Sequence, residues 1–494
     1  MSQKKNTLAL RPMALATALM CLAAGAQAAT IVVTSRDPAG VGFNDTTPVS
    51  PVGGNPGTTL GQQRWNVYQY VAGIWGNALQ SNVTITVNAG WEALTCDASS
   101  AVLGSASPWN YWRGFTGSKA NTWYPQALAN KLAGVNLSEG NEDDGTGYGN
   151  VDIKTQFNIN LGKTGCFTGG GFYLGLDGNV PAGQTNFMTT LLHELGHGLG
   201  FSVNPTSSLS GQRVNAAFTA YSDSGLPSIW EQFMYDSTKQ KTWLDMGTAS
   251  ADRKASGTNT GNLSWNGPIT VAEAAETLAH PQAIVAASPA QAKPSLFPFS
   301  PALFGAPVGT STNLGSVADS ASQACTALPA ATAAAVKGRV AIVDRGTCNF
   351  VIKAKVVQDA GAVGMIVVNN VAGALATMSG TDVTVTIPSV GLSQADGAAL
   401  RAMIPAASKY GSRGAPGTVY ASGGVDMSKR AGMDAGGRPL LYAPNPYVSG
   451  SSVSHWDISA FPNLLMEPNI NPDLTTTLSK PKDLTLPLLR DLGW

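Results

Sequence analysis

The sequence predicts an α/β (α+β) protein in which one domain is interrupted by a second, inserted α/β domain. Residues 30–285 combine a long amphipathic helix pattern with alternating strand patterns. A proline-rich stretch follows, and after it comes a compact pattern of strands and helices. Beyond this segment the pattern changes again. We therefore expect an insert at 290–424 that divides the first domain into 29–289 and 425–494.

The N-terminus has the composition of a cleavable export signal, which we assign to residues 1–28. Lys4 and Lys5 give a basic start, residues 12–25 are apolar, and Ala26-Gln27-Ala28 supplies the small residues that a signal peptidase needs. The apolar stretch is too short to span a membrane, and no later segment reaches the required length. The sequence thus predicts a secreted, extracellular protein without a membrane span.

The charge balance argues against partners that bind through a strong net charge on the protein. The chain has 30 basic and 30 acidic residues, and charged residues make up 12% of it. No overall charge would draw the protein to nucleic acid or to an anionic membrane surface. We therefore expect no nucleic-acid partner. The apolar fraction of 43% is enough for an ordinary globular core.

Four cysteines remain once the predicted signal, with Cys21, is removed: Cys96, Cys166, Cys325 and Cys348. An even number of cysteines in an exported protein indicates two disulfides, with three possible connectivities. Pairing of nearest neighbours would keep each bridge within one domain.

The first domain begins with a clear helix and strand. Residues 58–79 have helical apolar spacing, residues 83–87 alternate as a strand, and a second alternating strand is expected at 151–161. The acidic, glycine-rich loop 139–145 lies between these strands. Its oxygen ligands could bind Ca²⁺, although the EF-hand spacing is absent and a solvated loop is the alternative.

The insert shows its own regular elements after the five prolines between Ser288 and Pro307, which are too many for regular structure. Asn349 can cap one helix, and Ser393-Gln394-Ala395-Asp396 forms a capping box for another. The expected elements are a strand at 339–343, a helix at 350–360, a strand at 364–368 and a helix that reaches Met403.

The segment from Asn186 to Phe201 carries the strongest chemical signal. His193 and His197 are four residues apart, so both imidazoles lie on one face of a helix and can reach one Zn²⁺ ion. Glu194, next to the first histidine, is suited to take a proton from zinc-bound water and pass it to a leaving amine. Because the chain has only 4 histidines, chance is a poor explanation for this spacing.

A catalytic zinc normally has three protein ligands and a water molecule, so one ligand is still missing. The extended signature would place it at position 203, but this residue is Val203. The remaining histidines are His280, which precedes Pro281 in an expected surface loop, and His455 in the motif Ser454-His455-Trp456-Asp457.

Three motifs together resemble the leishmanolysin-type metzincins. They are the segment from His193 to Phe201, the distant Ser-His-Trp-Asp, and Met466-Glu467-Pro468; the closing residues 484–494 are also similar to the final helix of that family. The resemblance implies that His455 is the third metal ligand. It also implies that Met466 forms a methionine turn beneath the metal site.

The insert resembles a second family, the protease-associated (PA) domains. The similarity is carried by Gly338 to Phe350, by Lys353-Ala354 and by Gly361 to Gly364. Such domains are non-catalytic modules that bind or gate protein substrates. Together the resemblances imply a metzincin-like zinc peptidase domain split by a PA-type domain, which acts as an endopeptidase on proteins or peptides.

Other interpretations remain open at this point. The third ligand could be a glutamate, with Glu231, Glu273 or Glu276 available. The chain could be a secreted binding or adhesion protein with a structural zinc, or a zinc hydrolase of non-peptide substrates. Tyr442 and Tyr447 are candidates for stabilising an oxyanion.

Overall fold

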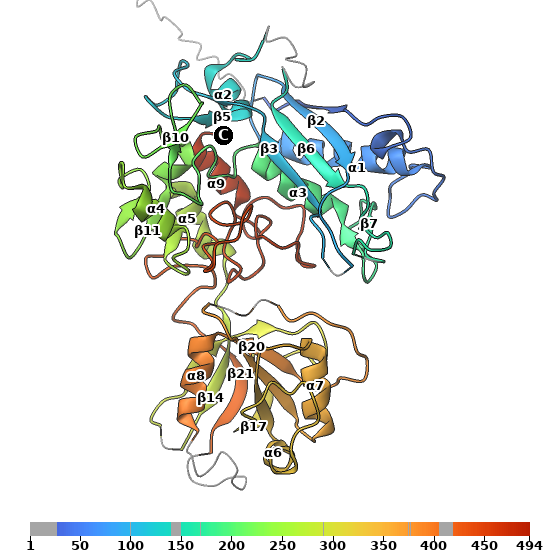
Figure 1. Ribbon diagram of the computed structural model, residues 1–494, viewed down its shortest axis with the longest axis vertical. Coiled ribbons are helices and arrows are strands. Elements are labelled where there is room, and N and C mark those ends of the chain that lie inside the picture. The colour runs from blue at the N-terminus through green and yellow to red at the C-terminus, as the bar shows by residue number, and fades with distance from the viewer. Residues whose placement is uncertain are drawn as a thin grey trace, which may run out of the picture.

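The structure is a computed structural model in which two bodies lie one above the other (Figure 1). The predicted export signal, up to residue 26, and nearly all of the acidic loop 139–145 lie outside the described residues, so the calcium expectation lies outside them too. The described residues are 27–98, 100–139, 150–167, 169–289, 291–373, 375, 377–404 and 418–494.

The upper body is built on a four-stranded sheet in the order β1-β2-β6-β3. The first three strands are parallel, and β3 pairs with β6 in the antiparallel sense. The expected strands at 83–87 and 151–161 correspond to β2 and β6. The bounds are β1 (Ile31–Ser35), β2 (Ile85–Glu92), β6 (Ile153–Asn158) and β3 (Gly104–Pro108).

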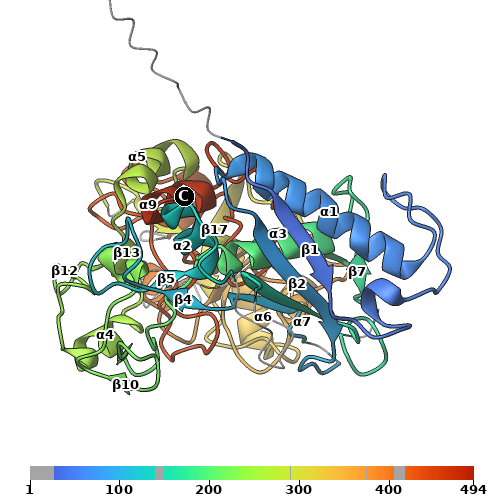
Figure 2. The ribbon, with the colours of Figure 1, turned by 90° about the horizontal axis from the view of Figure 1, so that it is seen from above.

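Two helices, α1 (Leu60–Ala78) and α3 (Phe187–Gly198), pack against this sheet and against each other (Figure 2). The Thr59 hydroxyl caps α1 by accepting a hydrogen bond from the backbone N–H of Gln62. Val67, Val71 and Trp75 recur every four residues and are fully buried, as the apolar spacing predicts. This packing fixes α3 behind the edge strand β3.

The rest of the upper body contains short helices and two- or three-stranded ribbons. The last helix, α9, packs on α5, and its Asp491 carboxylate accepts hydrogen bonds from the backbone N–H groups of Ile269 and Thr270. The C-terminal segment therefore caps a helix that lies more than 200 positions earlier. The helices are α2 (Gln126–Ala133), α4 (Ser250–Ser256), α5 (Pro268–Thr277) and α9 (Thr485–Leu492). The ribbons are β4 (Tyr111–Trp112), β5 (Tyr124–Pro125), β7 (Phe172–Tyr173), β8 (Thr185–Asn186), β9 (Arg213–Val214), β10 (Tyr221–Ser222), β11 (Met234–Asp236), β12 (Lys241–Thr242) and β13 (Leu263–Trp265).

The insert forms the lower body, an eight-stranded sheet in the order β15-β14-β21-β17-β18-β19-β20-β16. Its first strand in the chain, β14, starts at Gln282, so the sheet begins ahead of residue 290. The expected elements correspond to β18, α7, β19 and α8. The bounds are β14 (Gln282–Ala287), β15 (Ser295–Pro298), β16 (Ser300–Pro301), β17 (Asn313–Asp319), α6 (Ala330–Val336), β18 (Val340–Asp344), α7 (Phe350–Asp359), β19 (Gly364–Val368), β20 (Ser389–Leu392), α8 (Gln394–Met403) and β21 (Tyr420–Val425).

The proline-rich stretch is more regular than its composition predicts, because β15 and β16 both lie within it. The expectation of no regular structure there was wrong. Both strands stand at the two ends of the sheet order, where one side of the strand needs no partner. A proline, which has no backbone N–H to donate, is tolerated at such an edge.

The chain leaves the upper body and returns to it at adjacent points. Strands β14 and β21 pair with each other, with Gln282 opposite Val425. Just above them, the backbone N–H of Asp426 donates to the Pro281 carbonyl and that of Ala431 donates to the Ala279 carbonyl, both at 3.0 Å. The connection is therefore a hydrogen-bonded double strand.

Both disulfides expected from nearest-neighbour pairing are present, Cys96–Cys166 in the upper body and Cys325–Cys348 in the insert. Each bridge stays within one body. No helix in the described part of the chain combines the length and apolar character that crossing a bilayer requires.

Candidate metal centre

Helix α3 carries the histidine motif, and His193 and Glu194 on it are buried. Its first turn is capped by Asn186, whose side-chain oxygen accepts from the backbone N–H groups of Met188 and Thr189. Gly198 lies so close to β6 that a Cβ there would come within 2.3 Å of the Ile153 side chain. Glycine is required at this point because the helix packs directly on the sheet.

The structure brings His193, His197 and His455 together. The Nε2 atoms of His193 and His197 are 3.1 Å apart, and those of His197 and His455 are 3.2 Å apart. This is the separation that tetrahedral ligands about 2.0–2.1 Å from one zinc ion require. Within the described residues, these three form the one group of histidine, cysteine or carboxylate side chains close enough to share a metal ion.

Backbone carbonyls orient all three rings. The Nδ1 atoms of His193, His197 and His455 lie 2.7–2.8 Å from carbonyl oxygens. A carbonyl can only accept, so each Nδ1 carries the proton and each Nε2 presents a lone pair to the centre. These carbonyls belong to Leu465, Phe201 and Ser451, respectively.

The rings are held neutral, which suits metal binding. Burial lowers the pKa of His193 to about 3 and that of His197 to about 4, and it lowers the pKa of His455 well below the ordinary value. Three lone pairs that point at one another repel, and a cation between them removes that repulsion. The donor set therefore fits a divalent ion such as Zn²⁺.

Glu194 lies on the same helix with its side chain buried at the metal-binding group. Burial raises the pKa of its carboxyl group to about 8 in the metal-free protein, and a hydrogen bond with the Ala106 backbone opposes this rise. A divalent cation nearby would favour the carboxylate and lower this pKa. Beside a bound cation Glu194 would therefore be a carboxylate, the form in which a general base accepts a proton.

Met466 lies directly beneath the histidines and is fully buried. A Cβ at Gly196 would be 2.7 Å from the Met466 sulfur, so the thioether packs against the middle of α3. The Met466 carbonyl accepts a hydrogen bond from the backbone N–H of Trp456, the residue after His455. This turn therefore holds the segment of the third histidine against the helix of the other two.

An aspartate supports the same turn from below. The Asp483 carboxylate accepts hydrogen bonds from the backbone N–H groups of Leu465 and Thr485, both at 2.6 Å. Leu465 is the residue whose carbonyl orients the His193 ring. Burial raises the pKa of Asp483 to about 6.

Val203, which occupies the position of a third histidine in the extended signature, touches the His455 segment. Its backbone N–H donates to the Ser454 hydroxyl at 3.1 Å, and its carbonyl accepts from the Ser228 hydroxyl at 3.3 Å. The valine side chain is buried. The chain after α3 therefore braces the segment that carries His455.

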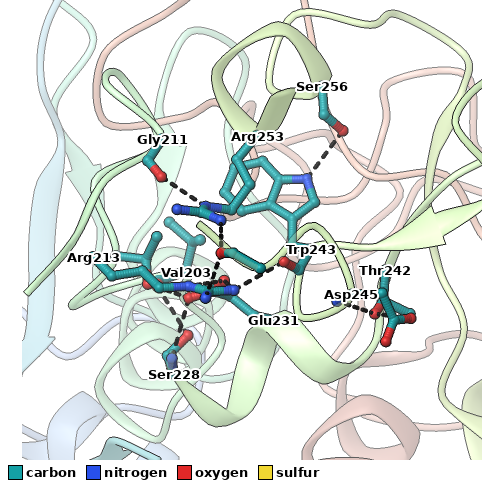
Figure 3. A network of polar contacts seen from close by, with 12 residues as sticks. Val203, Gly211, Arg213, Ser228, Glu231, Thr242, Trp243, Asp245, Arg253 and Ser256 are labelled. Carbon is teal, nitrogen blue, oxygen red and sulfur yellow. Dashed lines mark hydrogen bonds and ion pairs between the residues drawn. The ribbon is translucent and has the colours of Figure 1, made fainter. Parts of the chain in front are cut away.

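Glu231 is the centre of a buried polar network beside this segment (Figure 3). Its carboxylate lies 2.7 Å from the Arg213 guanidinium and also accepts from the Thr206 hydroxyl. Arg213 and Arg253 both donate to the Gly247 carbonyl. Glu231 is fully buried and forms an ion pair with Arg213. It therefore stabilises the chain segment that follows α3.

The other residues considered from the sequence lie elsewhere. Glu276 is paired with Lys480 on the surface, and Glu273 lies on the same helix, α5. His280 is half-buried at the crossing between the bodies, with Nδ1 2.6 Å from the Lys429 carbonyl. None of the three belongs to the group of described residues that could share a metal ion.

A cleft of about 650 Å³ opens in front of the histidines. One wall is residues 101–108, which include β3, and the opposite wall comes from residues 202–208 and 447–455. Tyr447 lines it, with its hydroxyl 2.8 Å from that of Ser208. Among the described lining residues, Glu194 is the one carboxylate.

Sequence reasoning did not find the β3 wall of the cleft. Gly104-Ser105-Ala106-Ser107-Pro108 consists of small residues and has no apolar alternation. Strand patterns depend on that alternation, so this strand left no signal. Tyr442 was also considered, but among the residues described as lining the cleft only Tyr447 is a tyrosine.

Comparison with known proteins identifies one part of the chain. The profile of the PA domain family matches residues 312–400, so the insert contains a PA domain. "Leucine aminopeptidase 2" of Arthroderma otae is 44% identical over 69 residues, which is 14% of this chain and 14% of that protein. The "PII-type proteinase" of Lacticaseibacillus paracasei is 46% identical over 61 residues, 12% of this chain and 3% of that protein.

The chain thus covers only a small part of the length of these curated relatives. Among solved structures, a zinc aminopeptidase from Bacillus subtilis, BSAP, is 21% identical, with 30% of this chain and 31% of that chain covered and a TM-score of 0.21.

Proposed function

We propose that the protein is a secreted zinc endopeptidase of the leishmanolysin-like metzincin type, with a PA domain inserted in its peptidase domain. The observation that carries this is the convergence of three neutral imidazoles beside one buried carboxylate in an open cleft. His193, His197 and His455 would hold the zinc. When bound, zinc supplies a water of lowered pKa and polarises the scissile carbonyl.

Glu194 acts as the general base in this proposal. It takes a proton from the attacking water and passes it to the amine of the leaving fragment, which keeps the proton count balanced. Its burial raises its proton affinity, and this favours holding the proton between the two steps. The carbonyl-fixed Nδ1 protons keep the three imidazoles in the ligating tautomer throughout.

The cleft favours an internal peptide bond over an N-terminal one. An aminopeptidase must neutralise the α-ammonium group of its substrate, but no carboxylate besides Glu194 occurs among the described lining residues. β3 ends the sheet order, so its outer edge can pair with an extended polypeptide. These features support cleavage within proteins or peptides.

The alternative roles fit the site less well. A structural zinc site is closed by four protein ligands, whereas the three histidines open onto a cleft and stand beside a buried carboxylate. A glutamate third ligand would have to replace His455. Glu231 is not available for this, because its carboxylate forms a buried ion pair with Arg213.

Zinc analysis with a casein and peptide digest tests the proposal. The mature protein should contain about one zinc per chain and cleave an N-acetylated peptide internally, and o-phenanthroline should abolish cleavage. Glu194→Ala should keep the zinc and lose most turnover, because the ligands remain intact. Release of single N-terminal residues, with no cleavage of the acetylated peptide, would show an aminopeptidase instead.

Secretion is tested separately by N-terminal sequencing of the protein recovered outside the cell. We expect it to begin at Ala29. A mature chain that still carries Lys4 and Lys5 would contradict the assignment of residues 1–28 as a cleaved signal.

A further inference from the structure

A second cavity of about 420 Å³ lies between the two bodies. Its lining comes from the loop before α3, from the segment that follows the methionine turn, and from Leu303 of the insert. Ile470 lines both this cavity and the cleft of the metal centre. Ile470 is therefore a shared wall residue of the cleft and of the second cavity, which also reaches Leu303 of the insert.

The lining is uncharged and combines apolar side chains with the polar side chains of Gln184, Thr185, Asn186, Thr189 and Asn471. Val180, Pro181, Ile470 and Leu474 contribute from the upper body, and no acidic or basic side chain occurs among the described lining residues. Leu303 has 57% of its surface exposed, so its side chain is accessible to a bound polypeptide. Such a site disfavours a charged side chain, and its apolar residues can contact an apolar one.

The backbone of Leu303 is held in place by contacts with the rest of the insert. Its backbone N–H donates to the Met378 carbonyl at 2.9 Å, and Ala302 forms a β-bridge with the same residue. Met378 is fully buried, and Phe304 on the other side of Leu303 is buried as well. The exposed leucine side chain is therefore anchored by the core of the insert.

The sheet indicates which end of the cleft leads to this cavity. Gly104, at the start of β3, pairs with Phe157, whose ring lies 4.9 Å from that of Phe187 at the start of α3. Pro108, at the other end of β3, pairs with Ile153, which contacts Gly198 at the end of α3. Asn186 and Thr189 at the start of α3 line the second cavity, so it lies at the Gly104 end.

A polypeptide that pairs with β3 in the antiparallel sense, the more stable of the two pairings, runs from the Pro108 end to the Gly104 end. We propose that Leu303 and Ile470 form a subsite for an apolar side chain of the substrate on the C-terminal side of the scissile bond. The PA domain thereby takes part in substrate selection. This inference rests on the proposed endopeptidase function.

The test compares Leu303→Asp with Val383→Asp, a matched change at a residue of the insert that is 91% exposed and is not among the described lining residues. Zinc content is measured for both proteins. Each protein is given two N-acetylated peptides that share a cleavage site identified in the casein digest. One peptide stops soon after the scissile bond, and the other continues with apolar residues.

For Leu303→Asp we expect the ratio of kcat/KM for the long peptide to that for the short peptide to fall about 10-fold, because a charged side chain replaces an apolar contact with the substrate. Val383→Asp should leave the ratio unchanged. An unchanged ratio in Leu303→Asp would overturn the proposal, and so would a changed preference confined to residues before the scissile bond. Absence of zinc-dependent cleavage by the wild-type protein would instead refute the endopeptidase function itself.

Discussion

Replacement of Glu231 by glutamine separates a structural role for this residue from a role in metal binding. Glutamine has nearly the same shape and keeps one oxygen that can accept from Thr206 and from the backbone N–H of Ser228. What it removes is the negative charge that faces Arg213. The Arg213 side chain is only 6% exposed, so its charge would be left buried without a partner.

Breaking a buried ion pair on one side costs about 3–5 kcal/mol. Arg213 would keep its hydrogen bonds to the carbonyls of Gly247 and Trp243, at 2.8 and 2.9 Å. These contacts offset part of the loss, so we expect a decrease of about 3 kcal/mol in the free energy of unfolding of the upper body. Zinc content should stay at the wild-type value.

Urea unfolding followed by tryptophan fluorescence measures this quantity for the upper body alone. All 11 tryptophans lie outside residues 282–425, so the insert contributes no signal. The matched control is Glu276→Gln, in which a surface pair with Lys480 is lost at a cost of at most about 1 kcal/mol. A loss of less than about 1 kcal/mol in Glu231→Gln, or a loss of zinc at unchanged stability, would refute the structural assignment.

Two further predictions concern the histidines. His455→Ala should weaken zinc binding by more than about 100-fold in competition with a chromophoric chelator, since one of three ligands is lost, whereas His280→Ala should have wild-type affinity. Equal effects of the two changes would contradict the assignment of His455. In the chelated, metal-free protein, the depressed pKa values of His193 and His197 mean that the unfolded state binds more protons below pH 6.5. The contribution of these histidines to stability should therefore be complete above pH 6.5 and fall as the pH is lowered towards 4, by on the order of 2 kcal/mol per histidine at pH 5. The raised pKa values of Glu194 and Asp483 act in the opposite direction, so the histidine pKa values are measured directly by NMR titration. His193 and His197 imidazoles that titrate near the ordinary pKa of 6.5 in an NMR titration of the metal-free protein would contradict the burial of neutral imidazoles.

The sequence predicted the parts of the centre that are local in the chain. His193, Glu194 and His197 share one helix, so their spacing alone places them together. His455 is 258 positions from His197, and no periodicity spans such a distance. Its assignment depended on the resemblance to a family, and the folded insert explains how it reaches the helix.

The features that were not foreseen depend on pairing between distant residues. β14 belongs to the sheet of the insert because β21, more than 130 positions later, pairs with it. β3 is a strand because β6 supplies its hydrogen bonds, since its own residues are small. The edge strands β15 and β16 tolerate proline only because of their place in the sheet.

The paired crossing between the two bodies has a mechanical consequence. A single-chain linker would let the insert swivel freely, but two antiparallel strands joined by hydrogen bonds resist twisting and stretching and yield mainly by bending. The insert should therefore move towards and away from the cleft by bending of this double strand. Leu303 would then move in one direction only, towards or away from Ile470. The distance between these two side chains would limit the size of the polypeptide that can enter.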